Sequence, residues 1–364
     1  MLIDLIAGTR PNFMKIAPII KEMNREWKGG SRFKYRLIHT AQHYDHNMSE
    51  SFFHQLGIPE PDVNFGVGSG SQAEQTAGIM VAYEKVLTER KSNLCIVVGD
   101  VTSTMACAIT AQKMHVPVAH VEGGIRSGDW AMPEEINRLA TDSVTNWFFT
   151  TSEFANKNLR KSGVNEDRIF FVGNTMIDTL IANLGHLKVP AFWNDAGLKK
   201  NNYFVITMHR PSNVDSLQQL DSLLHTVAGN VHGLPIVFPV HPRTEKNLRK
   251  ISAHSPNLYF AEPQGYLEFN YLVKHAKGVI TDSGGITEET TVMGIPCLTL
   301  RKNTERPETI TIGTNELVGD DPARIADALG RIMSNKWKKG GIPELWDGKT
   351  SERIVRHLNQ ILQV

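Results

Sequence analysis

Val279–Glu289, VITDSGGITEE, runs from a short apolar segment through a polar corner and two glycines into a segment with paired carboxylates. The apolar run Gly278–Thr281 predicts a buried strand of a parallel sheet. A helix follows, and Gly294 with the nearby Pro296 is typical of a helix end. The stretch therefore predicts one strand–turn–helix unit of an α/β fold.

The turn of this unit, Ser283, Gly284 and Gly285, is suited to hold an anion. Glycines leave backbone N–H groups open and a helix N-terminus adds partial positive charge, so a phosphate could bind there without any lysine. Glu289 lies about a turn and a half further along, where its carboxylate could accept hydrogen bonds from ribose hydroxyls. The alternative is a plain strand–helix turn with glycines for packing, because a lone Gly-Gly pair is weak evidence.

The composition is that of a globular protein large enough for two domains. The chain has 364 residues, of which 41% are hydrophobic and 21% charged, and its formal net charge is +1. A charge so close to neutral argues against a nucleic-acid surface. Cys95, Cys107 and Cys297 lie in apolar runs without CxxC spacing, so we expect reduced core residues and neither a metal site nor a disulfide.

The N-terminal run, MLIDLIAGTRPNF, is too short and too quickly polar for a signal peptide. No apolar run approaches the ~20 residues that a helix needs to span a bilayer. We therefore expect a cytoplasmic protein that makes no contact with a membrane.

Apolar strand-like runs alternate with helical patterns along the whole chain. Gly173-Asn174-Thr175 marks the expected crossing point between two halves, after which the pattern starts again. We expect an α/β protein of two doubly wound, Rossmann-like domains that face a central cleft. The first would comprise residues 1–172 with a C-terminal helix at 350–364, and the second residues 173–349.

Arg10 and Lys15 follow the β-rich run Leu2–Ala7, in the first turns of a helix that Pro11 opens. The carboxyl edge of a parallel sheet is where ligands bind in open α/β folds. Cations at a helix N-terminus oppose its dipole, so we expect these two to meet an anion. Solvation at the surface is the competing explanation.

Three carboxylates stand at comparable places in the first half. Asp100 follows the strand Leu94–Val98, although it could also serve as a helix cap. Glu122 ends the next predicted strand, directly before two glycines. Glu134 follows Pro133 in the first turn of a helix, and we expect it to share one helical face with Asn137 and Arg138.

The second half presents polar side chains at four strand ends, which are His209, His241, Ser283 and Arg306. Gln264 and Tyr266 follow a further strand, and the tyrosine ring could face a base. No Walker A lysine motif occurs and no GxGxxG follows a strand, so ATP chemistry and a redox dinucleotide are disfavoured. The division suits a nucleotide diphosphate on the second half, with its attached group facing acids and bases of the first.

Gln42 and His43 open a polar loop after the second predicted strand. His43 and His46 are spaced for a metal, but one carboxylate and no third ligand at the usual spacing argue against a metal site.

Several motifs together carry a family resemblance. They are GTRPNFMKIAPI, GDVTST, HVEGGIRSGD, MPEEINR, TMHRPSNVD, TDSGGITEE and TERPE, in this order from Ile6 to about Gly319. The chain resembles the non-hydrolysing UDP-N-acetylglucosamine 2-epimerases. The resemblance implies the GT-B fold, a homodimer, and reversible interconversion of UDP-GlcNAc and UDP-ManNAc without a cofactor. It also implies the route, which is loss of UDP, a 2-acetamidoglucal intermediate and re-addition of UDP.

The resemblance assigns roles to the residues found above. The catalytic group comprises Asp100, Glu122, Glu134, Lys15 and His209. The residues expected to bind substrate or UDP are Arg10, His241, Gln264, Tyr266, Ser283, Gly284, Gly285, Glu289 and Arg306. Gln42 and His43 correspond to a loop that binds a second UDP-GlcNAc as activator in some members. Many members carry Arg where Tyr44 stands here, and the loop GVGSGS lacks an expected arginine.

Alternatives remain open at this point. The segments QHYDHNMS, HPRT and PQGYLEF also resemble epimerases of UDP-2,3-diacetamido-2,3-dideoxy-glucuronate, whereas TERPE favours the GlcNAc enzymes. A GT-B glycosyltransferase would share the fold, since fold alone does not fix function. A hydrolysing 2-epimerase or a silent UDP-sugar-binding protein would also use similar residues. Supply of precursors for surface polysaccharides is implied by the resemblance alone.

Overall fold

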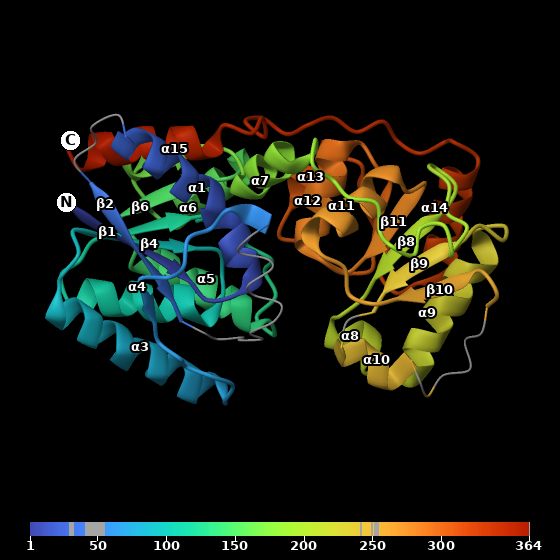
Figure 1. Ribbon diagram of the computed structural model, residues 1–364, viewed down its shortest axis with the longest axis horizontal. Coiled ribbons are helices and arrows are strands. Elements are labelled where there is room, and N and C mark those ends of the chain that lie inside the picture. The colour runs from blue at the N-terminus through green and yellow to red at the C-terminus, as the bar shows by residue number, and fades with distance from the viewer. Residues whose placement is uncertain (29–32, 41–54, 241, 249, 251–254, 364) are drawn as a thin grey trace. The chain divides into compact units, whose positions relative to one another are not determined.

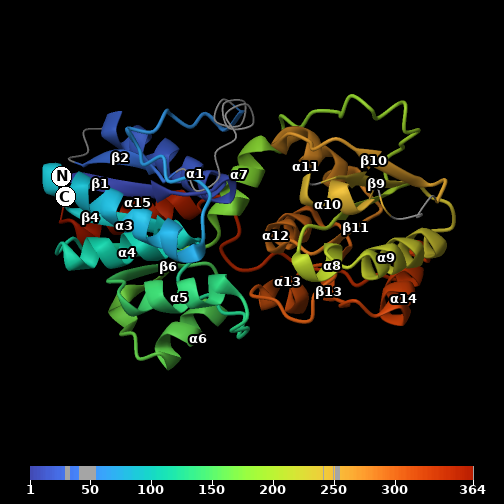
Figure 2. The ribbon, with the colours of Figure 1, turned by 90° about the horizontal axis from the view of Figure 1, so that it is seen from below.

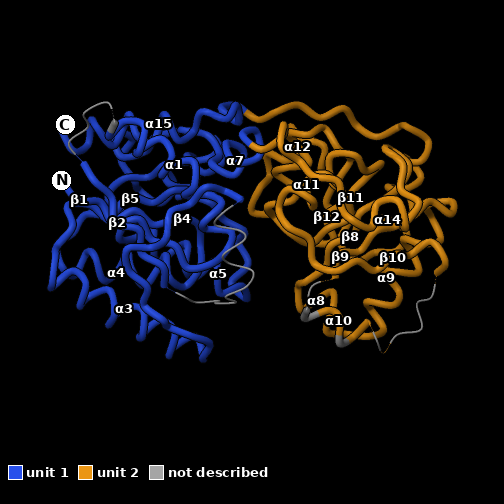
Figure 3. Tube along the Cα trace, viewed as in Figure 1, with its two compact units in different colours: residues 1–182, 344–364 blue, residues 183–343 orange. Residues whose placement is uncertain are grey.

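The computed structural model describes residues 1–28, 33–40, 55–240, 242–248, 250 and 255–363, and every structural statement below concerns these residues. The chain forms two compact units (Figure 3). Unit 1 comprises Met1–Ala182 with Glu344–Val364, and unit 2 comprises Asn183–Pro343. The functional domain boundaries suggested by the sequence, at residues 172–173 and 349–350, stay a prediction.

Unit 1 is built around a parallel sheet of seven strands in the order β3-β2-β1-β4-β5-β6-β7 (Figure 1). Its central strands are short apolar runs, and every residue of β4 is buried, as expected for a parallel sheet covered on both faces. The strands are β1 (Leu2–Ala7), β2 (Lys34–His39), β3 (Val63–Asn64), β4 (Leu94–Val98), β5 (Val118–Val121), β6 (Trp147–Thr150) and β7 (Ile169–Phe171).

Helices cover both faces of this sheet. Figures 1 and 2 show α1 and α15 along one face and α3 and α4 along the other. The helices are α1 (Arg10–Lys28), α3 (Gln72–Glu89), α4 (Thr102–Lys113), α5 (Pro133–Ser143), α6 (Glu153–Lys161), a 3-10 turn at Glu166–Arg168, α7 (Thr175–Asn183) and α15 (Thr350–Ile361).

The C-terminal helix α15 is fastened to unit 1 by a carboxylate from α7. Asp178 accepts hydrogen bonds from the backbone N–H groups of Thr350 and Ser351, at 3.0 and 2.7 Å. These are two of the N–H groups that a helix cannot satisfy by itself, and the negative charge also suits the helix dipole. Trp346 adds a hydrogen bond from its indole to the carbonyl of Thr151. These contacts hold α15 within unit 1.

Unit 2 contains a parallel sheet of six strands in the order β10-β9-β8-β11-β12-β13. The strand predicted at Gly278–Thr281 is confirmed as β11, with all four residues buried. The other strands are β8 (Phe204–Thr207), β9 (Ile236–Pro239), β10 (Leu258–Ala261), β12 (Cys297–Thr299) and β13 (Asn315–Leu317).

Two apolar layers enclose this sheet. Residues of α9 and α14 pack with Phe204, Ile206 and Ile280 on one face, and residues of α11 pack with Val205 and Val279 on the other. The alternation follows from the two-residue period of a strand. The helices are α8 (Pro211–Val214), α9 (Leu217–Asn230), α10 (Pro242–Leu248), α11 (Tyr266–His275), α12 (Gly284–Met293), α13 (Pro307–Thr311) and α14 (Pro322–Met333).

Each sheet has a switch point where the strand order reverses. In unit 1 the chain runs outward from β1 through β2 to β3 and then returns to the other side of β1 as β4. Unit 2 repeats this with β8 and β11. Ligands of open α/β sheets bind outside the carboxyl ends of the strands at such points. The predicted doubly wound architecture is confirmed for both halves.

A membrane span, a metal site and a disulfide each require a particular arrangement of the described residues. In the described part of the chain, no helix has both the length and the apolar character needed to cross a membrane. Across the same residues, no group of three or more His, Cys, Asp or Glu side chains is arranged to hold a metal ion. Cys95, Cys107 and Cys297 are buried free thiols, and burial raises the pKa of Cys297 to about 12.

Candidate active site

The turn from β1 into α1 is held in place by one buried side chain, Asn12. Its Oδ1 accepts hydrogen bonds from the backbone N–H groups of Gly8 and Thr9, at 3.2 and 3.1 Å. Its Nδ2 donates to the carbonyl of Val98 at the end of β4. The amide thus ties the start of α1 to the switch point, and this places Lys15 at the carboxyl edge of the sheet.

Lys15 and Glu122 form an ion pair at this edge. The ammonium Nζ lies 2.7 Å from Oε2 of the carboxylate, and the side chains are 12% and 2% exposed. A Cβ added to Gly99, at the end of β4, would lie 3.3 Å from the same ammonium. Glu122 has φ 70, a left-handed conformation that is strained for a residue other than glycine. Residues held in such strained backbone conformations cluster at functional sites.

The two glycines after Glu122 allow this corner to approach its neighbours. A Cβ added to Gly123 would lie 2.8 Å from the ring of Phe148. One added to Gly124 would lie 2.5 Å from the backbone carbonyl oxygen of Ala155, and Gly124 has φ 81. The glycines therefore let strand β6, through Phe148, and helix α6, through Ala155, hold the Glu122 corner closely.

We expect Gly124→Ala to lower the free energy of unfolding by about 3–5 kcal/mol, because it adds a backbone clash to left-handed strain. Gly128→Ala is the matched control, since Gly128 has φ 72 but an added Cβ would meet nothing within 4 Å. In the control only left-handed strain should act, so its free energy of unfolding should fall by about 1–2 kcal/mol. Urea denaturation of both variants measures the difference, and equal losses would contradict the close approach.

Asp100 is held by two residues of α5. The guanidinium of Arg138 donates to its Oδ2 at 2.5 Å, and Asn137 donates to its backbone carbonyl at 2.9 Å. Arg138 is buried and also bonds Glu135, at 2.9 Å. Burial alone would raise the pKa of Glu135, but backbone N–H donors and Arg138 outweigh it and hold the pKa below its ordinary value.

Glu134 differs from the other two predicted carboxylates. It is half-buried in the first turn of α5, and its side chain makes no hydrogen bond or ion pair with the residues that the structure describes. The helical face that the sequence assigned to Glu134, Asn137 and Arg138 is used by Asn137 and Arg138, while the carboxylate that joins Arg138 is Glu135. Asp100 and Glu122 therefore each have a cation partner, and Glu134 has none among the described residues.

In unit 2, a buried carboxylate organises the switch point between β8 and β11. Asp282 accepts hydrogen bonds from the backbone N–H groups of His209 and Arg210, at 3.1 and 2.9 Å, and from Nδ2 of Asn213 at 3.0 Å. Nδ1 of His209 lies 3.0 Å from the same carboxylate. Burial alone would raise the pKa of Asp282, but these donors outweigh it and lower the pKa. Asp282 thus fixes His209, whose side chain is 46% exposed.

The turn into α12 has the arrangement that the sequence suggested. Ser283 is the N-cap residue and its side chain makes no capping hydrogen bond with the described residues. Its backbone N–H donates to Oγ1 of Thr281. A Cβ added to Gly284 would lie 2.9 Å from Oε1 of Glu305, so glycine lets the loop after β12 approach. The first N–H groups of α12 are therefore available to an anion.

Glu289 is buried in α12 beside two residues of α11. Its Oε1 accepts a hydrogen bond from the hydroxyl of Tyr266 at 3.0 Å and one from Nδ2 of Asn270 at 3.3 Å. Burial raises the pKa of Glu289 to about 7, which the two donors reduce only in part. The adjacent Glu288 pairs with Arg306. The structure thus gives the Tyr266 hydroxyl a defined partner, and a contact of its ring with a base stays a prediction.

The remaining predicted residues are placed as follows. Arg10 is exposed at the start of α1. Gln264 is half-buried and donates to the carbonyl of Glu262. Gln42, His43 and His241 lie outside the described residues.

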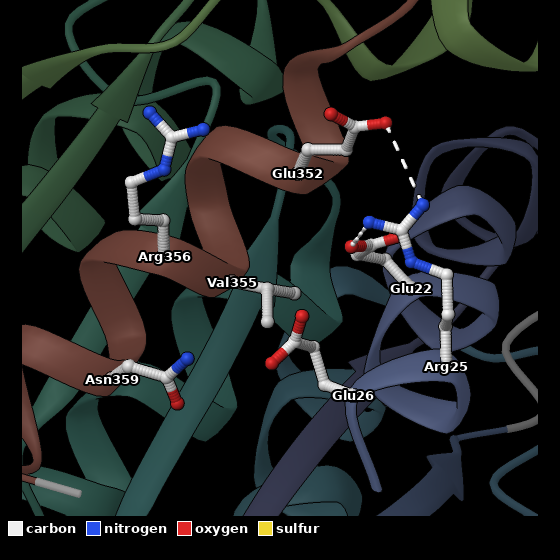
Figure 4. Close-up of a pocket in the computed structure, with 7 residues that line it drawn as sticks. All are labelled: Glu22, Arg25, Glu26, Glu352, Val355, Arg356 and Asn359. Atoms are coloured by element: carbon white, nitrogen blue, oxygen red, sulfur yellow. Dashed lines mark ion pairs between the residues drawn. The ribbon is translucent and has the colours of Figure 1, made fainter. Parts of the chain in front are cut away.

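A pocket of about 150 Å³ lies between α1 and α15, away from these residues (Figure 4). Glu22 and Arg25, both on α1, pair at 2.8 Å, and Arg25 lies 3.9 Å from Glu352 of α15 across the pocket. The later turns of α1 line this pocket, whereas Lys15 lies in an earlier turn of the same helix. Its lining residues are Glu22, Arg25, Glu26, Glu352, Val355, Arg356 and Asn359.

The chain is similar to known proteins over nearly its full length. The family model described as UDP-N-acetylglucosamine 2-epimerase matches residues 25–359. A UDP-N-acetylglucosamine 2-epimerase from Methanocaldococcus jannaschii is 40% identical over 98% of this chain and 99% of the relative. A UDP-2,3-diacetamido-2,3-dideoxy-D-glucuronate 2-epimerase from Pseudomonas aeruginosa is 34% identical over 99% of this chain and 100% of the relative.

Solved structures agree with this relationship. The crystal structure of the Methanocaldococcus jannaschii UDP-GlcNAc 2-epimerase in complex with UDP-GlcNAc and UDP matches with a TM-score of 0.87 and 38% identity, covering 99% of this chain and 100% of that chain. A UDP-glucosyltransferase from Polygonum tinctorium matches with a TM-score of 0.59 at 11% identity, covering 100% of this chain and 93% of that chain, and shows likeness of fold alone. The chain has a GT-B-like fold and belongs to the UDP-N-acetylglucosamine 2-epimerase family.

Proposed function

We propose that this protein interconverts UDP-GlcNAc and UDP-ManNAc reversibly and without hydrolysis. The observation that carries the proposal is the pair of ion-paired carboxylates at one sheet edge of unit 1, Asp100 with Arg138 and Glu122 with Lys15. Family membership at up to 40% identity supports the same activity. A binding protein would have no need of two such carboxylates beside the switch point.

The nucleotide is assigned to unit 2. The open N–H groups at the start of α12, after Ser283, suit the diphosphate. Glu289 would accept hydrogen bonds from the ribose hydroxyls. His209, fixed by Asp282, would donate to a phosphate oxygen as UDP departs. Stabilising the leaving group in this way lowers the barrier to breaking the C1–O bond.

The chemistry explains why carboxylates are needed. The C2 proton is not acidic, because no carbonyl lies next to C2. UDP must therefore leave with the electron pair of the C1–O bond, which builds positive charge on C1 and the ring oxygen. Removal of the C2 proton then forms the C1–C2 double bond of a 2-acetamidoglucal. UDP adds back to C1 while a proton is delivered to the opposite face of C2, so two acid/base groups are required.

The contacts suggest how these roles are divided. Asp100 and Glu122 each have a cation partner, and carboxylates placed in this way suit proton acceptance and stabilisation of the positively charged ring. Glu134 has no such partner among the described residues and therefore suits the role of the acid, the group that supplies a proton in the reaction. Lys15 would lose its anionic partner each time Glu122 takes up a proton and regain it when the proton leaves.

Product analysis tests the proposal. Purified protein is incubated with UDP-GlcNAc, without NAD or an acceptor, and the products are separated by ion-exchange chromatography. We expect UDP-ManNAc as the product, in an equilibrium reached from either epimer. Free ManNAc with UDP would show a hydrolysing enzyme instead, and transfer of GlcNAc only after addition of an acceptor would show a transferase.

A second candidate is 2-epimerisation of a UDP-2,3-diacetamido-2,3-dideoxy-glucuronate. The observation that favours it is the 34% identity over 99% of this chain to an enzyme of that name. This function predicts no change in UDP-GlcNAc and turnover of the diacetamido uronate in the same assay. The proposal for this protein also includes a homodimer in the cytoplasm that supplies precursors for surface polysaccharides.

A further inference from the structure

His120 lies wholly inside unit 1, and both of its ring nitrogens have an oxygen partner. The residue is 0% exposed in β5. Nδ1 lies 2.7 Å from Oδ1 of Asp142, and Nε2 lies 2.7 Å from the carbonyl oxygen of Gly99. A Cβ added to Gly123 would lie 3.4 Å from Nδ1, so the corner after Glu122 packs directly beside the ring.

Both of these partners are acceptors. A carbonyl oxygen only accepts, so Nε2 of His120 must carry a proton. Asp142 also receives the guanidinium of Arg126 at 2.6 Å and the N–H of Gly124 at 3.0 Å, both on Oδ2. Burial alone would raise the pKa of Asp142, but His120 and Arg126 outweigh it and lower the pKa. The guanidinium of Arg126 and the N–H of Gly124 both donate to this carboxylate, so its Oδ1 faces Nδ1 as an acceptor and Nδ1 carries a proton as well.

The two contacts of His120 reach both catalytic corners. Gly99 directly precedes Asp100 in the chain, so one hydrogen bond fixes the peptide from which Asp100 projects. The other partner of His120, Asp142, also accepts a hydrogen bond from the N–H of Gly124. Gly124 is the last residue of the corner that begins at Glu122. Through Gly99 and Asp142, one ring thus links the end of β4 to the corner that follows β5.

We propose that His120 is a positioning residue, an imidazolium that sets the spacing of Asp100 and Glu122 by tying Gly99 to Asp142. This inference rests on the proposed function, which gives the two carboxylates their chemistry. The charged groups that face the ring are Asp142 from α5 and Arg126 from the loop after β5. The ion pair of Lys15 and Glu122 lies beside Gly99 and carries no net charge.

Nitrogen-15 NMR of the histidine rings tests the protonation state directly in the full-length protein. We expect one ring with two slowly exchanging N–H protons at pH 7. His39 is an internal contrast, because it is also buried and burial lowers its pKa to about 4, so it should show one N–H. If His120 shows a single N–H at pH 7, the inference is overturned, whatever the catalytic activity.

His120→Asn tests the positioning role. The amide can make only one of the two donations, and a displacement of about 1 Å at a reacting group costs about 100-fold in rate. We expect kcat to fall about 100-fold while KM and the affinity for UDP change less than about threefold. The matched control is His115→Asn, at an exposed position with φ 55 that asparagine tolerates.

The outcomes separate the possibilities. Unchanged kcat in a folded His120→Asn variant would overturn the positioning role. If the variant fails to fold, the ring protons of the unaltered protein still decide the inference. If the unaltered protein epimerises nothing but the ring carries two protons, the proposed function fails while the imidazolium stands.

Discussion

Replacing Glu122 by glutamine is expected to lower turnover by at least ~100-fold, and Asp100→Asn should do the same. An amide keeps nearly the same shape but cannot accept the C2 proton, and it no longer neutralises its cation. For Glu122 the effect is strengthened by burial, because its side chain is 2% exposed and that of Lys15 is 12% exposed. Loss of one charge leaves the other unpaired in a poorly solvated place.

Affinity for UDP should change little in both variants, since the nucleotide is assigned to unit 2. Initial rates give kcat, and titration calorimetry with UDP gives the affinity. Glu60→Gln is the control, because Glu60 is an exposed glutamate of unit 1. Normal turnover in either variant would remove that carboxylate from the mechanism, and normal turnover in both would remove the proposed division of roles.

Glu289→Gln is expected to stabilise the protein at pH 8 while weakening UDP binding. The folded-state pKa of Glu289 is about 7, above the ordinary value of 4.5. A raised pKa means that the folded state binds the proton more tightly than the unfolded state does. The stabilisation of the folded state by this group is therefore fully present below pH ~4.5 and is lost as the pH rises through ~7. Glutamine does not titrate, so the variant should gain about 3 kcal/mol at pH 8 and nothing at pH 4.

The binding effect should run in the opposite direction. Hydrogen bonds from ribose hydroxyls to a carboxylate contribute about 1.5–3 kcal/mol, so the variant should bind UDP about 10- to 100-fold more weakly. Urea denaturation at pH 5 and pH 8 and UDP titration at pH 8 measure both effects. Glu262→Gln, at an exposed glutamate of unit 2, is the control. A stability difference that does not depend on pH would contradict the raised pKa.

The sheets of both units were predictable because their strands are short apolar runs with polar residues at the carboxyl end. Gly278–Thr281 shows this well, since the run, the glycine turn and the helix all appear in the structure where the residues suggested them. Parallel strands buried on both faces carry a signal that needs no tertiary knowledge. The position of Asp100 and Glu122 after two such strands followed from the same signal.

The partners of these residues were not predictable, because they come from distant parts of the chain. Arg138 reaches Asp100 from a helix 38 positions later, and Lys15 reaches Glu122 across 107 positions. The sequence also favoured Glu134 on the face of Arg138, whereas the loop before α5 turns Glu135 inward through the N–H groups of Ser127 and Gly128. Asp282 stands within the quoted stretch, and its position at the end of β11 is a signal that could have identified it.

Deuterium exchange at C2 tests the central claim most directly. The protein is incubated in D2O with UDP-GlcNAc, and proton NMR follows the C2 position in both epimers. The account predicts UDP-ManNAc that carries deuterium at C2, with deuterium appearing in the recovered UDP-GlcNAc as the reaction reverses. Epimerisation that keeps the original proton at C2 would contradict removal of that proton and the roles given to Asp100 and Glu122.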